Sequence, residues 1–589
     1  MIFYKKRNIR IALFILIFIS NINVIFGQIS PRENAKLNYT QVMFEYPEIK
    51  NVSSYCIQVA ENPSTNDFEK NITLTQKDST TATLVNGLNF GSKYQWRYIA
   101  YNKSNQIIHT SKIYTFEILP LNHINKSIYR FTINKQVTDD GLLLLDGPRI
   151  AINLKGEVVW FLPVDSISTR CLRMTKEGSI TYIATNYNYT NTGTEINIHG
   201  DTLWKTPSAD KNLIGDSVNT YHHELVKLSN GNYMTMLNKY VLSNKRITAN
   251  KICYSTIIEF DKMNNVVWHW SSENCIHDTD LFYTGDNYDK ITINGMVRIF
   301  DAGHFNGFYL DELNDILYIS ARDISRIIKV DRKTGKILMN YGSKMPSGEA
   351  KYANDLFKFM HSPLLLPDGN IAVFSNNLRS NKSPKFVPAS VVIFSQPKTQ
   401  KDSSLKVWEF KCNFDTLYKS FSFGSGNVEY LDNKNFLVNM GDPIGRIFEV
   451  TPDKKVIWDC YPEVYSNLYS NWMPLYNYRV NYTKSLYPVY FTINNSINSD
   501  TLNDIKNPKI FFKINNEGSS NDSYIISYFI NNKAYKPINT DIVPSNKTID
   551  IEINLKKENL NHKDILITVC SSLNPKYKKE LKFYIDYKN

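Results

Sequence analysis

Short runs of alternating apolar and polar residues, separated by turn residues, recur along nearly the whole chain. They include residues 40–44, 54–59, 81–85, 95–101, 509–514, 524–530 and 549–553. An alternation with period two places one face of a strand in a core and the other in water. No apolar pattern with the period of a helix persists far enough to predict a long helix. The chain is therefore predicted to be all-β.

Between residues 120 and 487 a longer pattern recurs, in which an apolar strand, a polar turn and a second apolar strand end on Trp or a substitute. The six predicted hairpins are residues 150–160, 195–204, 257–268, 327–339, 391–408 and 447–458. Several follow another strand pair with a tight Asn-Gly turn, so each repeat holds four strands. Radial repetition of such sheets forms a propeller with a central channel. We predict a six-bladed β-propeller; two sandwiches with chance similarity are the alternative.

Two modules are predicted to flank the propeller. Residues 28–119 have the short alternating runs and turn residues that are typical of a β-sandwich. The segment 88–96 resembles the tyrosine corner of fibronectin type III domains, where a Tyr hydroxyl forms a hydrogen bond to nearby backbone. An N-terminal fibronectin-III-like β-sandwich is therefore expected. In residues 488–589 the Trp-closed hairpins stop and Asn-, Ser- and Lys-rich turns separate short strands. This pattern predicts a small C-terminal β-sandwich.

Residues 1–27 have the order of a signal peptide. Several Lys and Arg residues at positions 5–10 precede the apolar run 11–20, and the segment ends at Gly27. The run is shorter than the ~20 residues that a membrane-spanning helix needs, so cleavage near Gln28 is favoured over an uncleaved anchor. We expect a periplasmic or secreted protein.

Composition narrows the class of protein only slightly. Of 589 residues, 42% are hydrophobic and 21% are charged, which excludes a multi-spanning membrane protein and a disordered chain. The net charge of +12 is spread along the chain, so nucleic acid is not the favoured partner. Seven dispersed Cys residues are too few for a disulfide framework, although Cys253 and Cys275 flank one hairpin and could bridge it in an oxidising compartment.

Three of the ten His residues occupy comparable places in the repeats. His223 and His361 each precede the Asn of a Gly-Asn turn by nine residues, and His304 precedes the turn at Asn314 by ten. The innermost strands of a propeller surround one mouth of its channel, so residues far apart in the sequence line one pocket there. The three imidazoles are therefore predicted to converge.

A cluster of His side chains is a common metal site, and a metal-dependent hydrolase is one alternative. However, Asn306 and Arg322 fall beside His304, and the charge of an Arg disfavours a cation. No matching pair of carboxylates occurs at the same strand positions. We predict neither a metal nor another cofactor. A structural role in hydrogen bonds within the inner strands is the alternative for each His taken singly.

Four short segments carry a family resemblance: His-His-Glu-Leu at 222–225, His-Phe-Asn at 304–306, Ser-Ala-Arg at 320–322 and Met-His-Ser-Pro at 360–363. They are similar to the paired-His, H-x-N, S-x-R and Q-H-[ST] segments of the bacterial arylsulfate sulfotransferases, in which Gln is usual where this chain has Met360. These are PAPS-independent six-bladed propeller enzymes with an N-terminal β-sandwich. The resemblance covers roughly residues 30–487, and the C-terminal module has no counterpart.

The resemblance implies a ping-pong reaction, in which a His is sulfurylated on nitrogen by a phenolic sulfate and then passes the sulfuryl group to a phenol. His361 matches that nucleophile, and a neutral imidazole is nucleophilic near neutral pH. Arg322 suits the charge on the sulfuryl oxygens, because its planar fork can hold two of them. His223 and His304 are expected to assist the departing phenolate and the incoming phenol, and either could take either role.

Four further residues are candidates for binding the substrate: Asn306, His222, Ser425 and Asn427. Asn306 could donate a neutral hydrogen bond, and Ser425 and Asn427 fall where the next blade would place its His. By period-two alternation, His222 should point to the opposite side of its strand from His223, which favours a structural role.

The expected partners are a small phenolic sulfate donor and a phenol acceptor. We expect no nucleic acid and no contact with a membrane after cleavage of the leader, and a homodimer is left open. The alternative from another class is a non-catalytic secreted propeller that binds glycans or protein partners.

Overall fold

The computed structural model describes residues 29–49, 51–63, 67–121, 128–135, 140–164, 167–185, 191–207, 221–242, 251–274, 276, 291–294, 297–342, 356–377, 387–397, 403–414, 420, 422–494, 509–555 and 563–585. These ranges contain strands and short 3-10 helices but no α-helix, which confirms the all-β prediction. They also hold no helix long and apolar enough to cross a membrane. The predicted signal peptide at 1–27 lies outside the described residues, and so does Cys275, which leaves a bridge between Cys253 and Cys275 untested.

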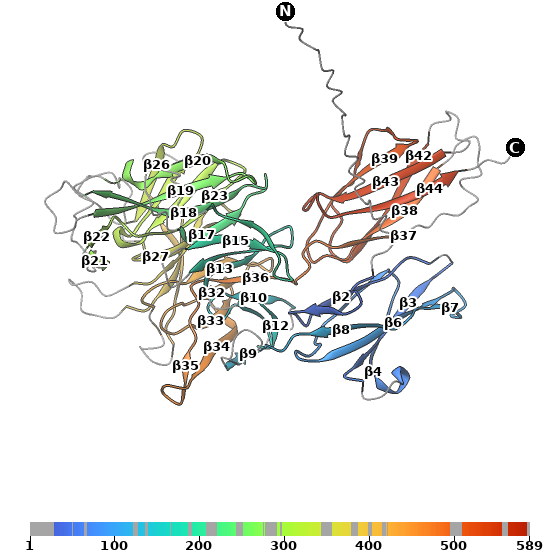
Figure 1. Ribbon diagram of the computed structural model, residues 1–589. Helices are drawn as coiled ribbons and strands as arrows, with labels where there is room; N and C mark the ends of the chain where they lie inside the picture. Colours follow the sequence, from blue (N-terminus) through green and yellow to red (C-terminus); the bar gives the residue numbers. More distant parts are fainter. Residues whose placement is uncertain are drawn as a thin grey trace, which may run out of the picture.

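Two facing sheets form the N-terminal module (Figure 1, blue). Their strands are β1 (Ala35–Leu37), β2 (Val42–Glu45), β3 (Ser54–Glu61), β4 (Ile72–Asp78), β5 (Ala82–Val85), β6 (Lys93–Tyr101), β7 (Ile107–Thr110) and β8 (Tyr114–Ile118). One sheet has the order β1-β8-β6-β3-β4 with β7 on β6, and β2 pairs with β5. Phe44 and Trp96 pack edge to face in the core. The Tyr94 hydroxyl accepts a hydrogen bond from Asn89 N at 2.7 Å, as the tyrosine corner predicts.

Six sheets in residues 129–483 each contain a four-strand antiparallel meander (Figure 1). From the innermost strand outward, the first three are β36 (Val480–Thr483), β10 (Leu142–Leu145), β11 (Ile150–Asn153), β12 (Val158–Phe161); β13 (Ser168–Met174), β14 (Ile180–Thr185), β15 (Thr192–Ile196), β16 (Thr202–Lys205); and β17 (Tyr221–Lys227), β18 (Tyr233–Leu242), β19 (Lys251–Phe260), β20 (Val266–Ser271). A hairpin of β21 (Ile291–Asn294) and β22 (Val297–Asp301) extends the third sheet by pairing β22 with β19.

The other three meanders are β23 (Phe305–Asp311), β24 (Ile316–Ala321), β25 (Arg326–Asp331), β26 (Ile337–Gly342); β27 (Met360–Leu365), β28 (Ile371–Ser375), β29 (Ser390–Phe394), β30 (Lys406–Lys411); and β31 (Asn427–Tyr430), β32 (Phe436–Asn439), β33 (Ile447–Val450), β34 (Val456–Ser466). β9 (Tyr129–Lys135) and β35 (Asn471–Pro474) pair with the long strand β34. The six predicted hairpins are the third and fourth strands of these meanders.

The innermost strands contact one another in a circular order. β13 contacts β17, β17 contacts β23, β23 contacts β27, β27 contacts β31, and both β31 and β13 contact β36. β36 comes from the C-terminal end of this region, yet it pairs with β10 from its N-terminal end. Segments more than 300 residues apart are thereby joined in one sheet, and the six innermost strands form a closed ring of contacts.

A repeated contact anchors the turn between the first two strands of some meanders. Asn232 Nδ2 donates to Glu259 Oε1 at 2.7 Å, and Asn435 Nδ2 donates to Glu449 Oε1 at 2.6 Å. In both cases the Glu lies on the third strand and is buried. The turn residues thus satisfy carboxylates that would otherwise be costly to bury.

The C-terminal module is a second pair of sheets (Figure 1, orange to red). Its strands are β37 (Phe491–Asn494), β38 (Lys509–Asn516), β39 (Tyr524–Ile530), β40 (Lys533–Ala534), β41 (Ile538–Asn539), β42 (Lys547–Asn554), β43 (Lys563–Ser571) and β44 (Lys578–Ile585). Phe512, Tyr524 and Ile567 belong to its own apolar core. The Glu45 carboxylate accepts hydrogen bonds from the Tyr490 hydroxyl and the Lys579 ammonium, which ties this module to the N-terminal sandwich.

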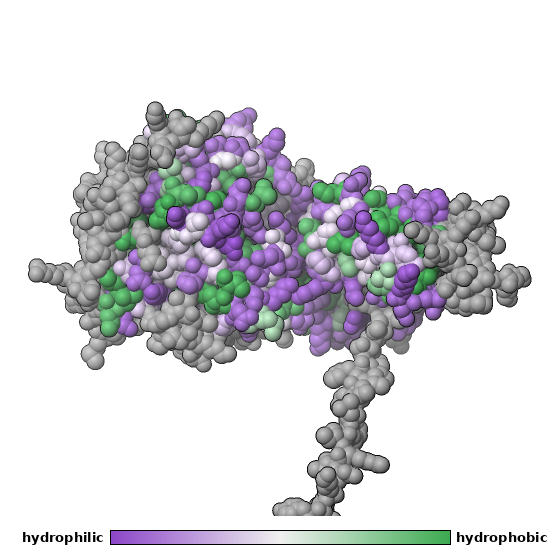
Figure 2. Space-filling model, turned by 90° about the horizontal axis from the view of Figure 1, so that it is seen from above, coloured by the Kyte–Doolittle hydropathy of each residue, from purple (hydrophilic) through white to green (hydrophobic). Residues whose placement is uncertain are grey.

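The face of the molecule in Figure 2 is mainly hydrophilic, with apolar residues in several separate small areas. This distribution is ordinary for a globular protein whose large apolar side chains fill its cores. On this face, no single apolar area marks a site.

Candidate active site

Imidazoles from three innermost strands meet at the centre of the six sheets. His223 lies on β17, His361 lies on β27, and His304 immediately precedes β23. The ring centroids of His223 and His304 are 5.4 Å apart. The ring of Tyr478, just before β36, lies 5.5 Å from that of His223 and 6.2 Å from that of His361. The structure therefore brings the three predicted His residues together, with Tyr478 between two of them.

His361 is held in one tautomer by two hydrogen bonds. Its Nδ1 is 2.6 Å from Asn376 Oδ1, and the orientation of that amide is set because Asn376 Nδ2 donates to the Ser425 carbonyl at 3.1 Å. Since a carbonyl oxygen only accepts, the proton of His361 is on Nδ1. Nε2 holds the lone pair and accepts a hydrogen bond from Ser425 N at 3.1 Å. Nε2 is therefore the nitrogen of His361 that could act as a nucleophile.

The surroundings of His361 keep its ring uncharged. The side chain is buried, and burial is the main cause that holds its pKa well below 6.5. The positive charges of Arg479 and Arg322 lower this pKa further. The imidazole of His361 therefore stays neutral even at pH values well below the physiological range.

His304 has the opposite character because a carboxylate accompanies it. Its Nδ1 lies 2.7 Å from Oδ2 of Asp301, the last residue of β22. Burial alone would lower the pKa of His304, but the charge of Asp301 outweighs it and raises the pKa above 6.5. The His304 side chain is 34% exposed, so solvent reaches the cluster here. Our sequence analysis did not single out Asp301; its position three residues before His304 is the only local signal.

His222 does not point away from His223, so the alternation prediction was wrong at this position. β17 pairs His222 with Met236 and Leu225 with Thr235, which leaves the two intervening residues unpaired. His223 has a φ of 61°, and this bulge turns its ring toward that of His222, with the Nδ1 atoms 2.5 Å apart. Burial, followed by the charge of His304, lowers the pKa of His222 to about 3. His222 therefore belongs to the cluster as a neutral ring.

The bulge also changes which His residues correspond between repeats. Counting from the Gly-Asn turns aligns His223 with His361. In the structure, however, Met236 on β18 and Phe374 on β28 occupy the same place, and they pair with His222 and His361. His222 is therefore the counterpart of His361 in the strand register, and His223 is an additional residue of the bulge.

Arg322 lies at the end of β24 and begins the short 3-10 helix η4 (Arg322–Ile324). Its backbone N donates to the His304 carbonyl at 3.0 Å. The guanidinium pairs with Asp323 at 2.6 Å and donates to the Phe423 carbonyl at 3.2 Å. These contacts hold the Arg322 cation between His304 and the segment that leads to Ser425.

Two of the predicted substrate-binding residues are engaged within the protein. Asn306 Nδ2 donates to the Met360 carbonyl at 3.1 Å, and its Oδ1 accepts from Ser320 Oγ at 2.6 Å. Asn427 Nδ2 donates to the Val480 carbonyl at 2.7 Å, and its Oδ1 accepts from Val480 N at 3.0 Å. Both amides thus join neighbouring innermost strands, and Asn306 fixes the residue before His361.

The third of these residues, Ser425, contacts His361 through its backbone. Its hydroxyl donates to the Gly424 carbonyl at 2.5 Å and accepts from Asp442 N at 3.1 Å. With a φ of 58°, Ser425 directs its own N–H at His361 Nε2. The contribution of Ser425 is therefore a main-chain donor rather than the side chain that the sequence indicated.

The segment before β36 supplies two residues whose role was not predicted. The Tyr478 hydroxyl donates to the Asn306 carbonyl at 3.1 Å. Arg479 is fully buried, donates to the carbonyls of Asn306 and Gly426, and lies 3.7 Å from Glu224 Oε2. No local sequence pattern shows which strands residues 477–479 will contact.

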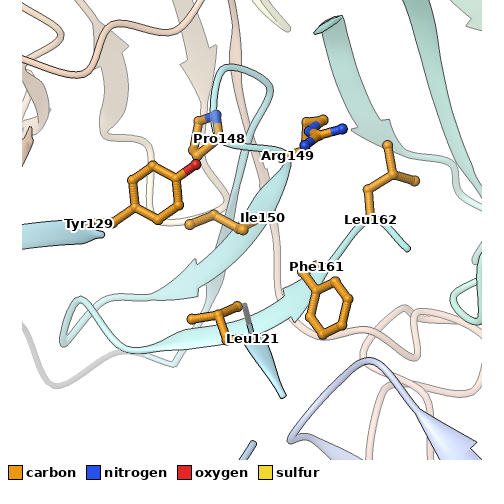
Figure 3. Close-up of a pocket in the computed structure, with 7 residues that line it drawn as sticks. All are labelled: Leu121, Tyr129, Pro148, Arg149, Ile150, Phe161 and Leu162. Carbon is orange, nitrogen blue, oxygen red and sulfur yellow. The ribbon is translucent and has the colours of Figure 1, made fainter. Parts of the chain in front are cut away.

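The positive charges that act on His361 at the centre of the six sheets come from Arg479 and Arg322. Within the described residues, no group of three or more His, Cys, Asp or Glu side chains is arranged to hold a metal ion. A small apolar pocket that includes Tyr129, Ile150 and Phe161 lies at β11 and β12, on outer strands of the first sheet (Figure 3). It contains none of the imidazoles and is separate from the cluster.

The arylsulfotransferase (ASST) family model matches residues 135–457, just over half of the chain. No curated protein matches the chain. Similar solved structures include a protein of unknown function from Bacteroides caccae, with 13% identity over 59% of this chain and 100% of that one and a TM-score of 0.36. The extracellular domain of a putative hybrid two-component system from B. thetaiotaomicron has 10% identity over 84% of this chain and 72% of that one, with a TM-score of 0.23. A putative exported protein from Bacteroides fragilis has 10% identity over 53% of this chain and 84% of that one, with a TM-score of 0.26. These structural similarities are too weak to support an argument.

Proposed function

The chain belongs to the arylsulfotransferase (ASST) family, and on that premise we propose that it transfers a sulfuryl group from an aryl sulfate to a phenol through a sulfohistidine at His361. Membership of the family implies a sulfotransferase acting on small aryl sulfates and phenols. The observation that carries the mechanism is the meeting of His223, His304 and His361 beside Arg322.

In the first half-reaction His361 Nε2 attacks sulfur. An N–S bond forms, the S–O bond to the aryl group breaks, and its electron pair stays on the phenolate oxygen. Nδ1 remains protonated and bonded to Asn376, so positive charge that develops on the ring is partly delocalised onto a hydrogen-bonded N–H. The N–H of Ser425 must leave Nε2 when the sulfuryl group binds, and it is then placed to donate to a sulfuryl oxygen.

We assign His304 as the acid that protonates the departing phenolate. The Asp301 carboxylate raises the pKa of His304, so a useful fraction is imidazolium near neutral pH. In the second half-reaction the same ring, now neutral, takes the proton of the incoming phenol while its oxygen attacks sulfur and the N–S bond breaks. A positioned acid or base of this kind contributes about 10² to 10⁴-fold.

Arg322 and His223 are assigned to the sulfuryl group itself. Arg322 supplies positive charge next to the nucleophile, as its effect on the pKa of His361 indicates. His223, whose pKa is held well below 6.5 mainly by burial, offers a neutral ring at 5.4 Å from His304. Arg322 would neutralise charge on the equatorial sulfuryl oxygens from one side, and His223 would form a hydrogen bond to them from the other.

We further propose that the six meanders are the blades of a propeller. The circular order of their innermost strands and the pairing of β36 with β10 support that number. The leader at residues 1–27 would direct the protein to the periplasm or outside the cell. A homodimer remains a proposal that oligomeric-state measurements can decide.

A donor and acceptor assay tests the proposed function. Purified protein with 4-nitrophenyl sulfate and phenol should release nitrophenolate and form phenyl sulfate, and His361→Ala should abolish both. Mass spectrometry after exposure to the donor alone should find an added SO₃ on His361. Full turnover by His361→Ala, or label on another residue, would contradict the assignment of the nucleophile.

A further inference from the structure

Arg170 is an exposed cation at the centre of the six sheets that the proposed mechanism does not use. It lies on β13, one of the innermost strands. Its guanidinium carbon is 5.2 Å from the centre of the Tyr478 ring, the ring that also contacts His223 and His361. Arg170 is therefore separated from the imidazole cluster by a single aromatic side chain.

The direction of Arg170 is set by the backbone on both sides of it. Thr169 Oγ1 donates to the Asp146 carbonyl at 2.6 Å, and Cys171 N donates to Asp146 Oδ2 at 2.9 Å. Cys171 has a φ of 55°, and the pairing of β13 with β14 shifts register between Arg170 and Arg173. Arg170 thus stands at a bulge whose flanking residues are both anchored, which is a preorganised position for a binding side chain.

Arg170 differs from Arg173, Arg322 and Arg479 in having no counter-ion within the described part of the chain. Arg173 and Arg479 pair with Glu224, and Arg322 pairs with Asp323. In the part of the chain that the structure describes, no carboxylate makes an ion pair with Arg170. An exposed, oriented and unpaired guanidinium can receive an external anion in bidentate form.

The Tyr478 ring that Arg170 faces lies 5.5 Å from the ring of His223 and 6.2 Å from that of His361, the proposed nucleophile. Burial is the main cause of the lowered pKa of His223, and the neighbouring His222, His304 and Arg170 lower it further. For His361 the corresponding charges are those of Arg479 and Arg322. In an in-line transfer the aryl group leaves on the face of sulfur opposite the attacking nitrogen. Because Arg322 serves the transferred group in the proposed mechanism, Arg170 is available to a second anionic group on the aryl part of the substrate.

We propose that Arg170 selects aryl sulfates and phenols whose ring carries a carboxylate, by pairing with that carboxylate. This inference rests on the proposed function of the site and adds the class of substrate to it. The sulfuryl oxygens and the ring carboxylate would then be bound by different arginines, Arg322 and Arg170, at opposite ends of the substrate.

The test compares two donors that differ mainly in charge, 4-carboxyphenyl sulfate and its methyl ester. Wild-type protein should prefer the carboxylate in kcat/KM, and Arg170→Gln should reduce the ratio of the two values at least about tenfold, the effect of losing a charge-assisted hydrogen bond. Arg170→Lys should keep part of the preference, because a point charge replaces the fork. Lys533→Gln, which removes another exposed cation from the face of a Tyr ring, should leave the ratio at its wild-type value.

Binding provides a second readout that needs no turnover. Titration calorimetry with 4-hydroxybenzoate and its methyl ester should show tighter binding of the acid to wild-type protein, and Arg170→Gln should lose that difference. An unchanged donor ratio together with equal binding of acid and ester would overturn the role of Arg170, while turnover of 4-nitrophenyl sulfate would leave the proposed function standing. Absence of turnover with every donor would instead refute the proposed function, and the binding difference would still decide whether Arg170 receives a carboxylate.

Discussion

The backbone N–H of Ser425 donates to Nε2 of His361 at 3.1 Å. Because Nδ1 of the same ring donates to Asn376, the nitrogen that Ser425 contacts is the one with the lone pair. One side chain and one main-chain group, from two neighbouring sheets, thus define both the tautomer and the direction of the nucleophile. The effect of the Asn376 contact on turnover can be measured by substitution.

Asn376→Leu should remove the control of the tautomer. The variant loses the acceptor for Nδ1–H, so the proton can move to Nε2 and block attack. We expect kcat with 4-nitrophenyl sulfate to fall at least about 10²-fold, since an incorrect tautomer costs about 10⁴-fold in serine proteases. The matched control is Ser422→Ala, which removes a partner of Asn376 Nδ2 but leaves Oδ1 in place. A rate for Asn376→Leu within twofold of that of the control would show that the tautomer is set by other contacts.

Asp301→Asn should move the alkaline limb of the pH profile to lower pH. His304 is active as an acid when protonated, and its activity is lost as pH rises through its pKa. The charged groups that face His304 are Asp301, Asp323, Arg322 and the neighbouring His222 and His223. Removing the carboxylate at 2.7 Å takes away the charge that raises the pKa of His304, so the pKa falls.

The measurement is kcat/KM against pH for phenyl sulfate, whose phenolate leaves poorly without a proton. With 4-nitrophenyl sulfate the substitution should change kcat/KM on the alkaline side less, because nitrophenolate needs little protonation to leave. An alkaline limb that stays in place for phenyl sulfate would remove His304 from the role of acid.

His222→Gln should make the protein less sensitive to acid. The folded pKa of His222 is about 3, below the ordinary 6.5, so the unfolded state binds a proton that the folded state lacks as pH falls below 6.5. The free energy of unfolding therefore decreases toward low pH, by roughly 1.4 kcal/mol per such group at pH 5.5. Urea unfolding at pH 7.5 and 5.5 should show that the variant loses less stability than the wild type by about this amount. Exposed His109→Gln is the control, and an equal loss in both variants would contradict the prediction.

Glu45→Gln should loosen the C-terminal module without affecting the site. The Glu45 carboxylate is buried between the Tyr490 hydroxyl and the Lys579 ammonium, and breaking a buried pair costs about 3–5 kcal/mol. Scanning calorimetry should show an unfolding transition at lower temperature, while turnover of 4-nitrophenyl sulfate stays within about twofold. The control is Lys513→Gln, whose exposed pair with Asp550 is worth less than about 1 kcal/mol. Equal transitions in both variants would mean that other contacts hold the module.

The hairpins could be predicted from the sequence because they are local. Ile150–Asn153 and Val158–Phe161 are adjacent in the chain, and alternation with a polar turn between them is enough to specify the pair. The closing residues Trp160 and Trp458 are both fully buried, as expected of apolar residues at the same place in a repeat. The count of six hairpins followed from this periodicity, whereas the circular order of the sheets depends on contacts that no local pattern contains.

The candidate site was predictable to the level of residue type and approximate position. His223, His304 and His361 converge because each stands near the start of an innermost strand. Alternation failed at His222 because a bulge adds residues that pair with nothing, and a φ of 61° at His223 has no distinctive sequence signal in a His residue.

The sequence by itself determined the strands, the repeat and the set of imidazoles, since these depend on hydrophobic spacing within short stretches. Only the tertiary structure decided what each imidazole can do. Asp301 reaches His304 from an inserted hairpin, Ser425 reaches His361 from the next sheet, and Tyr478 reaches the cluster from more than 100 residues away. The pKa and the free nitrogen of each ring are set by these partners, because burial and charge act through space and not along the chain.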